Sequence, residues 1–295
     1  MTSIPVILNP AAGGGRLLRG RKRLDAAAEA AGVTLEWWLT REPGHATELA
    51  SRAAREDRPL VLAYGGDGTY NEVARGLLGS ATPMGVLPGG TTSVLAYEFG
   101  VPRPAARAVT ALIAGEDRAM RVACSDRGDL ILLMVSAGPD SQVLSSLRPS
   151  LKRLGGRVGI AMQAVLEAFG RGPLPRFRVV IGCRSEESGW AVIGNSRCYA
   201  GPQQVTPGAD PFRDDLEVVL QRSVGRWAAL SFLVGIPRGG HLQREDVRCE
   251  TVTRVRLEPV SPGRDIPYQV DGDVVGCLPV EISVDERPLW VRLPG

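Results

Sequence analysis

The residues with the clearest potential for chemistry lie where an apolar stretch runs into a glycine-rich turn. Residues 60–64 are apolar, Gly65-Gly66-Asp67-Gly68-Thr69 follow, and a helical pattern begins at once. Glycines between a strand and a helix let the backbone approach a ligand, and the helix N-terminus offers amides to an anion. Asp67 would repel a bare phosphate, so the turn predicts a metal–nucleotide site. A tight structural turn is the alternative, because a lone glycine-rich turn is a weak signal.

Two more loops of this kind follow apolar stretches. Residues 4–8 lead into Asn9-Pro10 and three glycines, and residues 84–87 lead into Pro88-Gly89-Gly90-Thr91-Thr92, each with a helical pattern behind it. The carboxyl ends of parallel strands meet at one edge of an open α/β sheet, where ligands bind. We therefore expect the three loops to converge on one ligand.

The elements that position these loops alternate between strands and helices up to about residue 114, which predicts a parallel sheet with helices on both faces. Beyond it, short strands are separated by turns rich in Gly, Pro and Asp, with helical patterns at 159–169 and 226–233. The sequence thus predicts an α/β domain over residues 1–116 and a β-rich antiparallel domain over 117–286. A last strand within 287–295 is expected to return to the first domain.

The net charge, the cysteines and the lengths of the apolar stretches narrow the class of protein. A net charge of +3 over 295 residues is too small to indicate a nucleic-acid partner. Five scattered cysteines without a C-x-x-C pair argue against a zinc site or a disulfide framework and fit a reducing cytoplasm. We see no signal-peptide pattern, and no apolar stretch reaches the ~20 residues of a membrane span, so any membrane contact is expected to be peripheral.

Several motifs in fixed order carry a resemblance to a known family. The sequence lacks the P-loop, the H-R-D and D-F-G elements and a G-x-G-x-x-G that opens a helix. The motifs that it has resemble those of diacylglycerol kinases and sphingosine kinases, in the bacterial soluble form. They are the three loops with Asn71-Glu72, Leu95-Ala96 and Gly100-Val101-Pro102, then Ala137-Gly138 with Asp140, Asn195, Tyr199-Ala200-Gly201, Pro207 with Ala209-Asp210, Asp214-Asp215-Leu216 and Asp271-Gly272-Asp273.

This resemblance implies an α/β domain like that of NAD kinases and phosphofructokinases, a β-rich domain, and an active cleft between them. It implies ATP as phosphoryl donor, Mg²⁺ as its partner and a lipid hydroxyl as acceptor. The Asp214 side chain, with backbone oxygens near Pro211 and Leu216, would hold a structural Mg²⁺. The nucleotide contacts carried over by position are Asn9, Pro10, Thr40, Gly65, Gly66, Asp67, Gly68, Thr69, Tyr70, Asn71, Glu72, Gly90 and Thr91.

The catalytic base of the family is the Glu of an Asp-Gly-Glu motif, which falls on Asp273. This side chain is one methylene, ~1.5 Å, shorter than Glu, and Asp67 is the alternative base. Asp67 would otherwise hold Mg²⁺ or orient the attacking hydroxyl. A second departure is Ser93, where the family usually has Asn. Glu72 could equally favour a helix dipole, and the acidic loop around Asp214 could be a solvated turn.

The expected partner is a lipid at the membrane surface, with a homodimer left open. Two basic clusters, Arg19 with Arg21, Lys22 and Arg23, and Arg148 with Lys152, Arg153 and Arg157, could touch anionic headgroups or form solvated helix faces. The alternatives to a lipid kinase are a small-molecule kinase of the NAD kinase type and a nucleotide- or lipid-binding protein without catalysis.

Overall fold

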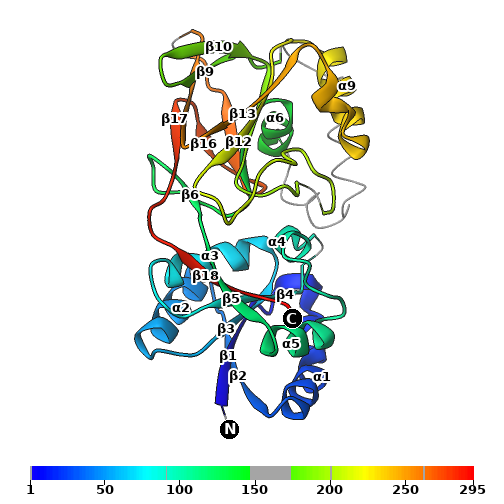
Figure 1. The fold of residues 1–295 in the computed structure, drawn as a ribbon, viewed down its shortest axis with the longest axis vertical. Helices are drawn as coiled ribbons and strands as arrows, with labels where there is room; N and C mark the ends of the chain where they lie inside the picture. The colour runs from blue at the N-terminus through cyan, green and yellow to red at the C-terminus, as the bar shows by residue number, and fades with distance from the viewer. Residues whose placement is uncertain (1, 91, 147–173, 200, 262) are drawn as a thin grey trace. The chain divides into compact units, whose positions relative to one another are not determined.

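The chain forms two compact units, which are described separately (Figure 1). One unit comprises Met1–Val122, Ala200–Pro202 and Asp285–Gly295, and the other comprises Ala123–Tyr199 and Gln203–Val284. The structure is a computed structural model, and it describes all residues except 1, 91, 147–173, 200 and 262. In the part of the chain that it describes, no helix is long and apolar enough to cross a bilayer.

The first unit is built on one six-stranded sheet in the order β2-β1-β3-β4-β18-β5. Its first four strands in the chain pair in parallel, which confirms the predicted α/β architecture, and β5 runs antiparallel to β18. The strands are β1 Thr2–Leu8, β2 Val33–Leu39, β3 Val61–Gly65, β4 Met84–Pro88, β5 Glu116–Met120 and β18 Leu289–Leu293.

Five helices connect these strands: α1 Leu17–Ala30, α2 His45–Arg55, α3 Asp67–Leu77, α4 Val94–Glu98 and α5 Ala105–Ile113. The chain moves from β1 to β2 in one direction and from β3 to β4 in the other. Right-handed crossovers therefore place α1 on one face of the sheet and α3 on the opposite face. Accordingly α2 packs against α3 while α1 packs against α5. The strand order reverses between β1 and β3, and ligands bind at such a reversal in open α/β sheets.

The second unit holds two antiparallel sheets, each of six strands. Their orders are β10-β9-β14-β17-β6-β7 and β13-β12-β11-β8-β15-β16. The first sheet contains β6 Ala123–Ser125, β7 Leu130–Ile131, β9 Phe177–Ile181, β10 Arg184–Ser188, β14 Arg254–Pro259 and β17 Val280–Val284. The second contains β8 Met134–Ala137, β11 Trp190–Gly194, β12 Leu216–Gln221, β13 Val247–Val252, β15 Pro267–Val270 and β16 Asp273–Cys277. Among the described residues of this unit, two helices accompany the sheets, α6 Pro139–Ser146 and α9 Arg226–Gly235.

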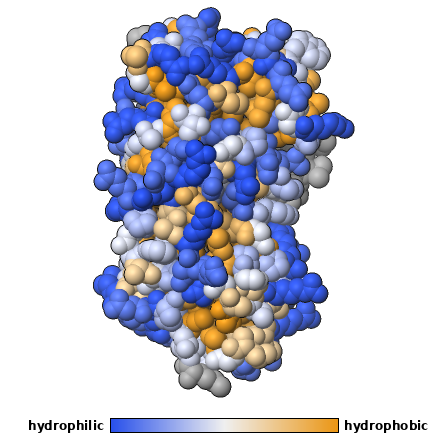
Figure 2. Space-filling model, in the orientation of Figure 1, coloured by the Kyte–Doolittle hydropathy of each residue, from blue (hydrophilic) through white to orange (hydrophobic). Residues whose placement is uncertain are grey.

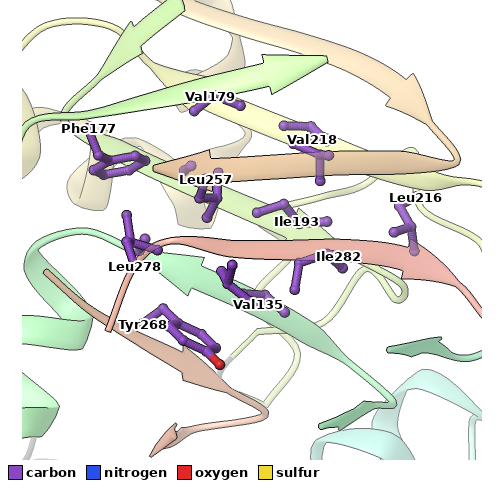
Figure 3. Packing of buried hydrophobic residues seen from close by; sticks show 14 of the residues in the cluster. Val135, Phe177, Val179, Ile193, Leu216, Val218, Leu257, Tyr268, Leu278 and Ile282 are labelled. Carbon is purple, nitrogen blue, oxygen red and sulfur yellow. The ribbon is translucent and has the colours of Figure 1, made fainter. Parts of the chain in front are cut away.

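The core of this unit is made by alternate side chains of both sheets. Phe177 and Leu257 come from one sheet, Ile193 and Val218 come from the other, and all four are buried within one apolar cluster. Figure 3 shows the side chains of this cluster gathered between the strands. Strands that bury one face in this way bring alternate residues into the core.

Two apolar runs of the sequence are divided in the structure. The apolar run 130–136 forms two strands in different sheets, because the amides of Leu132, Leu133 and Met134 donate to the carboxylate of Asp271. The run 120–124 likewise contributes to β5 in the first unit and to β6 in the second. The predicted helix 159–169 lies outside the described residues.

The close packing of α2 on α3 predicts that a glycine-to-alanine substitution in α3 destabilises the protein. Replacing a glycine inside a helix with alanine normally stabilises by roughly 0.5–1 kcal/mol. A methyl group on Gly76 of α3 would lie 2.4 Å from the Thr47 carbonyl oxygen and 2.6 Å from the Ala50 Cβ. We expect Gly76→Ala to lower the free energy of unfolding by about 1–3 kcal/mol, because the two helices must separate. Urea denaturation measures this change.

Gly20 of α1 supplies the matched control. The nearest atom to a methyl group there is the Tyr64 hydroxyl oxygen at 3.5 Å, an ordinary contact. Gly20→Ala should leave the free energy of unfolding equal or raise it. A Gly76→Ala variant as stable as Gly20→Ala would contradict the close helix packing.

Candidate functional site

The three glycine-rich loops meet at the carboxyl ends of β1, β3 and β4. A methyl group on Gly13 would lie 2.8 Å from the Gly89 carbonyl oxygen, and one on Gly90 would lie 2.7 Å from the Gly66 Cα. The Gly89 amide donates to the Gly65 carbonyl at 2.9 Å. Side chains at these positions would push the loops apart. The predicted convergence of the loops is therefore confirmed, and it depends on glycine.

Asn9 joins the first loop to the second at the point where the strand order reverses. Its side-chain amide donates to Thr69 Oγ1 at 3.3 Å, and its backbone amide donates to the Tyr64 carbonyl at 3.2 Å. Thr40 follows β2 on the other side of β1 and donates its backbone amide to the Leu8 carbonyl at 2.9 Å. Both residues thus lie at the sheet edge where the sequence placed them.

The N-terminus of α3 has no side-chain cap, so backbone amides of its first turn are available as donors. Its N-cap residue, Gly66, has extended backbone angles (φ −107°, ψ −176°) and provides no side-chain cap. The amides of Thr69 and Tyr70 donate to the Gly66 carbonyl, as in a regular first turn. The amides before them have no partner within the helix, so they can receive the oxygens of an anion.

Asp67 lies in this first turn, and its carboxylate holds the start of α4. Oδ2 accepts from the Val94 amide at 3.0 Å and from the Thr92 hydroxyl at 3.3 Å, while Oδ1 accepts from the Leu95 amide at 3.1 Å. The helix has no side-chain cap from its own N-cap residue, Ser93. Asp67 therefore has a structural function in the observed fold, namely to cap α4 from a distant part of the chain.

Tyr70 and Ser93 support the loops from beneath. The Tyr70 side chain is fully buried, and its hydroxyl lies 3.0 Å from the Gly65 carbonyl oxygen and 2.8 Å from that of Leu87. Burial raises the pKa of this hydroxyl, so it stays protonated as a donor. The Tyr70 side chain thus supports the loops, and its nucleotide contact stays a prediction.

Ser93 occupies a backbone conformation that suits asparagine better than serine. Its φ of +47° is left-handed, a region that Asn enters several-fold more readily than most residues. Its hydroxyl accepts from the Gly90 amide at 3.2 Å. Ser93 thus keeps the third loop closed although the expected Asn is missing. Thr91, which was predicted to contact the nucleotide, lies outside the described residues.

The Glu72 carboxylate interacts with the N-terminus of α2, whereas the dipole of its own helix, α3, was expected. This carboxylate accepts from the Ala46 amide in the first turn of α2 at 3.2 Å, and the Glu72 carbonyl accepts from the Thr47 hydroxyl at 2.8 Å. A carboxylate at a helix N-terminus is stabilising. The structure supports the dipole interpretation of Glu72, with α2 in place of α3. Asn71 beside it is half-buried.

The Asp271-Gly272-Asp273 turn connects β15 to β16 in the second unit. Asp271 (φ +51°) and Gly272 (φ +95°) are left-handed, and the Asp271 carboxylate accepts from three consecutive amides, those of residues 132–134, at 2.9–3.0 Å. The Gly272 amide donates to the buried side chain of Gln269 at 2.7 Å. The turn is thereby fixed from both sides, and Asp273 is exposed at the first position of β16. Sequence reasoning missed Gln269, whose burial no local pattern signals.

A second cluster of hydrogen-bonded polar side chains in this unit includes Asp140. The Tyr199 hydroxyl donates to Asp140 Oδ2 at 2.7 Å, and the Trp190 ring nitrogen donates to Ser136 Oγ at 3.1 Å. Burial raises the pKa of Asp140, while hydrogen bonds from Tyr199 and Ser136 oppose that rise. Burial and the neighbouring carboxylate also raise the pKa of Tyr199. Two of the motifs quoted from the sequence, those of Asp140 and Tyr199, are therefore in direct contact.

The acidic loop before β12 fits a cation only in part. Carboxylate and carbonyl oxygens are the ligands that Mg²⁺ prefers, which suits Asp214 with the carbonyls near Pro211 and Leu216. Asp210, however, accepts from the Phe212 amide at 3.0 Å, and Asp215 pairs with Arg213 at 2.5 Å. Among the described residues no group of three or more His, Cys, Asp or Glu side chains is arranged to hold a metal. The fit therefore depends on the one side chain of Asp214 and on backbone oxygens.

Comparison with known proteins gives matches over both units. Residues 3–125 match the model of the diacylglycerol kinase catalytic domain, and residues 134–293 match that of the YegS C-terminal NAD kinase beta sandwich-like domain. A diacylglycerol kinase of Mycobacterium tuberculosis is 26% identical over 99% of this chain and 95% of its own length. A "Probable lipid kinase YegS-like" of Chromohalobacter salexigens is 31% identical over 65% of this chain and 63% of its own.

Solved structures show the same fold. A structure of a diacylglycerol kinase from Bacillus anthracis superposes with a TM-score of 0.71 at 18% identity, covering 100% of this chain and 97% of the other. A further structure from the same organism reaches a TM-score of 0.81 at 20% identity, covering 100% and 95%. At these identities the likeness concerns the arrangement of the strands and helices.

The contacts of Asp67 predict its contribution to stability. In Asp67→Asn the side chain keeps its shape but presents N–H groups to one of the two amides of α4. We expect the free energy of unfolding to fall by about 1–2 kcal/mol, as for the loss of a helix cap. Urea denaturation without any ligand measures it. Glu29→Gln, at an exposed position of α1, is the control, and an Asp67→Asn variant as stable as this control would contradict the capping role.

Proposed function

Because the chain belongs to the family that joins a diacylglycerol kinase catalytic domain to a YegS C-terminal domain, we propose that it is an ATP- and Mg²⁺-dependent lipid kinase. It would transfer the γ-phosphoryl group of ATP to the hydroxyl of a lipid such as diacylglycerol or a sphingoid lipid. The observation that carries the proposal is the contact of the Gly66 and Gly90 backbones at the open N-terminus of α3. Amides at the open N-terminus of a helix, with glycines that let a ligand come close, suit phosphate oxygens.

The nucleotide would be held by backbone groups more than by side chains. The amides of Gly66 and Gly68 would bind phosphate oxygens, with Gly90 close beside them and Asn9 and Thr40 at the adjoining strand ends. Mg²⁺ bound with ATP would neutralise the phosphate charge. An ionised carboxylate has about four acceptor sites, so Asp67 keeps capacity for that ion beyond its three bonds to α4 and Thr92.

Asp273 would act as the general base. As the lipid hydroxyl attacks the γ-phosphorus, its proton would pass to the Asp273 carboxylate, and the bond from the phosphorus to the ADP oxygen would break. The fixed turn at Asp271 and Gly272 sets the position of the Asp273 backbone, and the exposed Asp273 side chain is accessible to a substrate. Asp67 is less suited to the role, because its hydrogen bonds to Thr92 and to the first turn of α4 hold its carboxylate in a structural position.

A structural Mg²⁺ would be held in the second unit by the Asp214 carboxylate with the backbone oxygens near Pro211 and Leu216. In that position a cation would order the loop that leads into β12. We propose that the chain acts at the cytoplasmic surface of the membrane, because a diacylated acceptor resides in a bilayer. The chain would reach this acceptor by peripheral contact.

A second candidate function has a specific observation behind it. The model that matches residues 134–293 is named for its likeness to the β-sandwich of NAD kinases, so a small-molecule kinase of that type is the alternative. A third candidate, a nucleotide- or lipid-binding protein without catalysis, is motivated by Asp273 and Ser93, which replace the residues usual in the family.

One experiment separates the three functions. The chain is incubated with ATP labelled at the γ-phosphate, Mg²⁺ and mixed micelles of diacylglycerol, monoacylglycerol, ceramide, sphingosine or phosphatidylglycerol, and in a parallel set with NAD. A labelled lipid is the expected product. Labelled NADP would establish the second function, and binding of ATP without a labelled product would establish the third.

The role of Asp273 gives a sharper prediction. Asp273→Ala should reduce turnover at least ~100-fold, the lower end for general-base catalysis, while the affinity for ATP stays within twofold. Kinetics and calorimetric titration of the two proteins measure these effects. The control is Asp265→Ala, at an exposed position of the same unit, which should keep its turnover. Turnover close to that of the unaltered protein in Asp273→Ala would refute the assignment.

A further inference from the structure

One helix of the second unit exposes large apolar side chains to solvent. Trp227 is 77% exposed and Val234 is 60% exposed, and Val224 and Leu233, at 44% and 38%, lie beside them in the sequence. We call these four residues the α9 patch. Figure 1 shows α9 in gold at the outer side of the β-rich unit, and in Figure 2 hydrophobic surface adjoins hydrophilic surface over that region.

The opposite face of α9 is already packed into the unit. Ala229 and Phe232 are buried, and the Phe232 ring lies 5.0 Å from the ring of Trp190 and 5.3 Å from that of His241. The exposed face is therefore not needed to attach the helix. A helix that is apolar on all sides is normally enclosed on all sides, so one face of α9 lacks the apolar partner that such a composition requires.

Arginine outnumbers acidic side chains beside the patch, where Glu245 and Asp246 also lie. Residues 222–244 contain four arginines and no aspartate or glutamate. Arg244 pairs with Asp246, but Arg222, Arg226 and Arg238 are exposed, and Arg222 donates to a backbone carbonyl, that of Glu245. An apolar patch bordered by arginine is complementary to a surface that offers hydrocarbon beneath anionic headgroups.

We propose that the α9 patch docks on the surface of an anionic phospholipid bilayer. Trp227 would lie at the headgroup level, which its amphipathic ring prefers, with Val234 and Leu233 at the acyl boundary and the arginines against lipid phosphates. A second copy of the chain is a poorer occupant. A two-fold contact sets the same surface against itself, so the positively charged borders of the patch would repel one another.

This docking surface goes beyond the proposed function and can be tested without it. Binding to vesicles requires neither ATP nor an acceptor lipid. A chain that binds vesicles through α9 and transfers no phosphate would contradict the lipid kinase alone. A chain that phosphorylates lipid in detergent micelles and ignores vesicles would contradict the docking surface alone.

The test is sedimentation of the full chain with vesicles of phosphatidylglycerol and phosphatidylcholine in equal amounts, compared with phosphatidylcholine vesicles. We expect strong preference for the anionic vesicles and its loss at high salt. Trp227→Ala should weaken binding about tenfold through lost apolar burial. Val234→Ser should weaken it in the same direction, and Arg226→Gln about fivefold, from ~1 kcal/mol per charge near the surface.

Controls remove the same kinds of side chain from the first unit. Trp290→Ala and Arg55→Gln, both at exposed positions, should bind as the unaltered protein does. The proposal would be overturned if Trp227→Ala and Val234→Ser bound vesicles as tightly as the unaltered protein. It would also be overturned if the control variants lost as much binding as these two variants. A dimer, seen by analytical ultracentrifugation, that Trp227→Ala dissociates while vesicle binding stays unchanged would overturn it as well, because the patch would then serve self-association.

Discussion

The organisation of both units depends on carboxylates that gather backbone amides far away in the sequence. Asp67 caps α4 and thereby fixes the third glycine-rich loop against the second. Asp271 draws the amides of residues 132–134 together and so ends one strand and begins another. Hydrogen bonds to an ionised acceptor are roughly twice as strong as neutral ones. These two side chains therefore set the positions from which the remaining loop residues project.

Much of the first unit could be predicted from the sequence, because its signals are local. Each loop follows an apolar strand and precedes a helix, and the rules for parallel sheets then bring the loops together at one edge. The glycines at 66 and 90 could be recognised as positions of close backbone approach, although the sequence does not say that they approach each other. In the second unit, the helix expected over 226–233 is α9 Arg226–Gly235.

The features that the sequence does not show are contacts between distant residues. Nothing local shows that Glu72 serves α2 or that Tyr70 is enclosed beneath the loops. The break in the apolar run 130–136 comes from Asp271, more than a hundred residues later. The strand β10, rich in charge, is a strand because it pairs with β9 at the edge of a sheet. Pairing and burial can override local preference in this way.

We propose that the glycine-rich loops present ATP for transfer of its γ-phosphoryl group to a lipid. The most direct test compares two labels, ATP carrying ³²P at the γ-position and ATP carrying it at the α-position, each with Mg²⁺ and diacylglycerol micelles, followed by extraction of the lipid. We expect label in the lipid from γ-labelled ATP alone. Label from the α-position, or none from either while ATP binds, would contradict it.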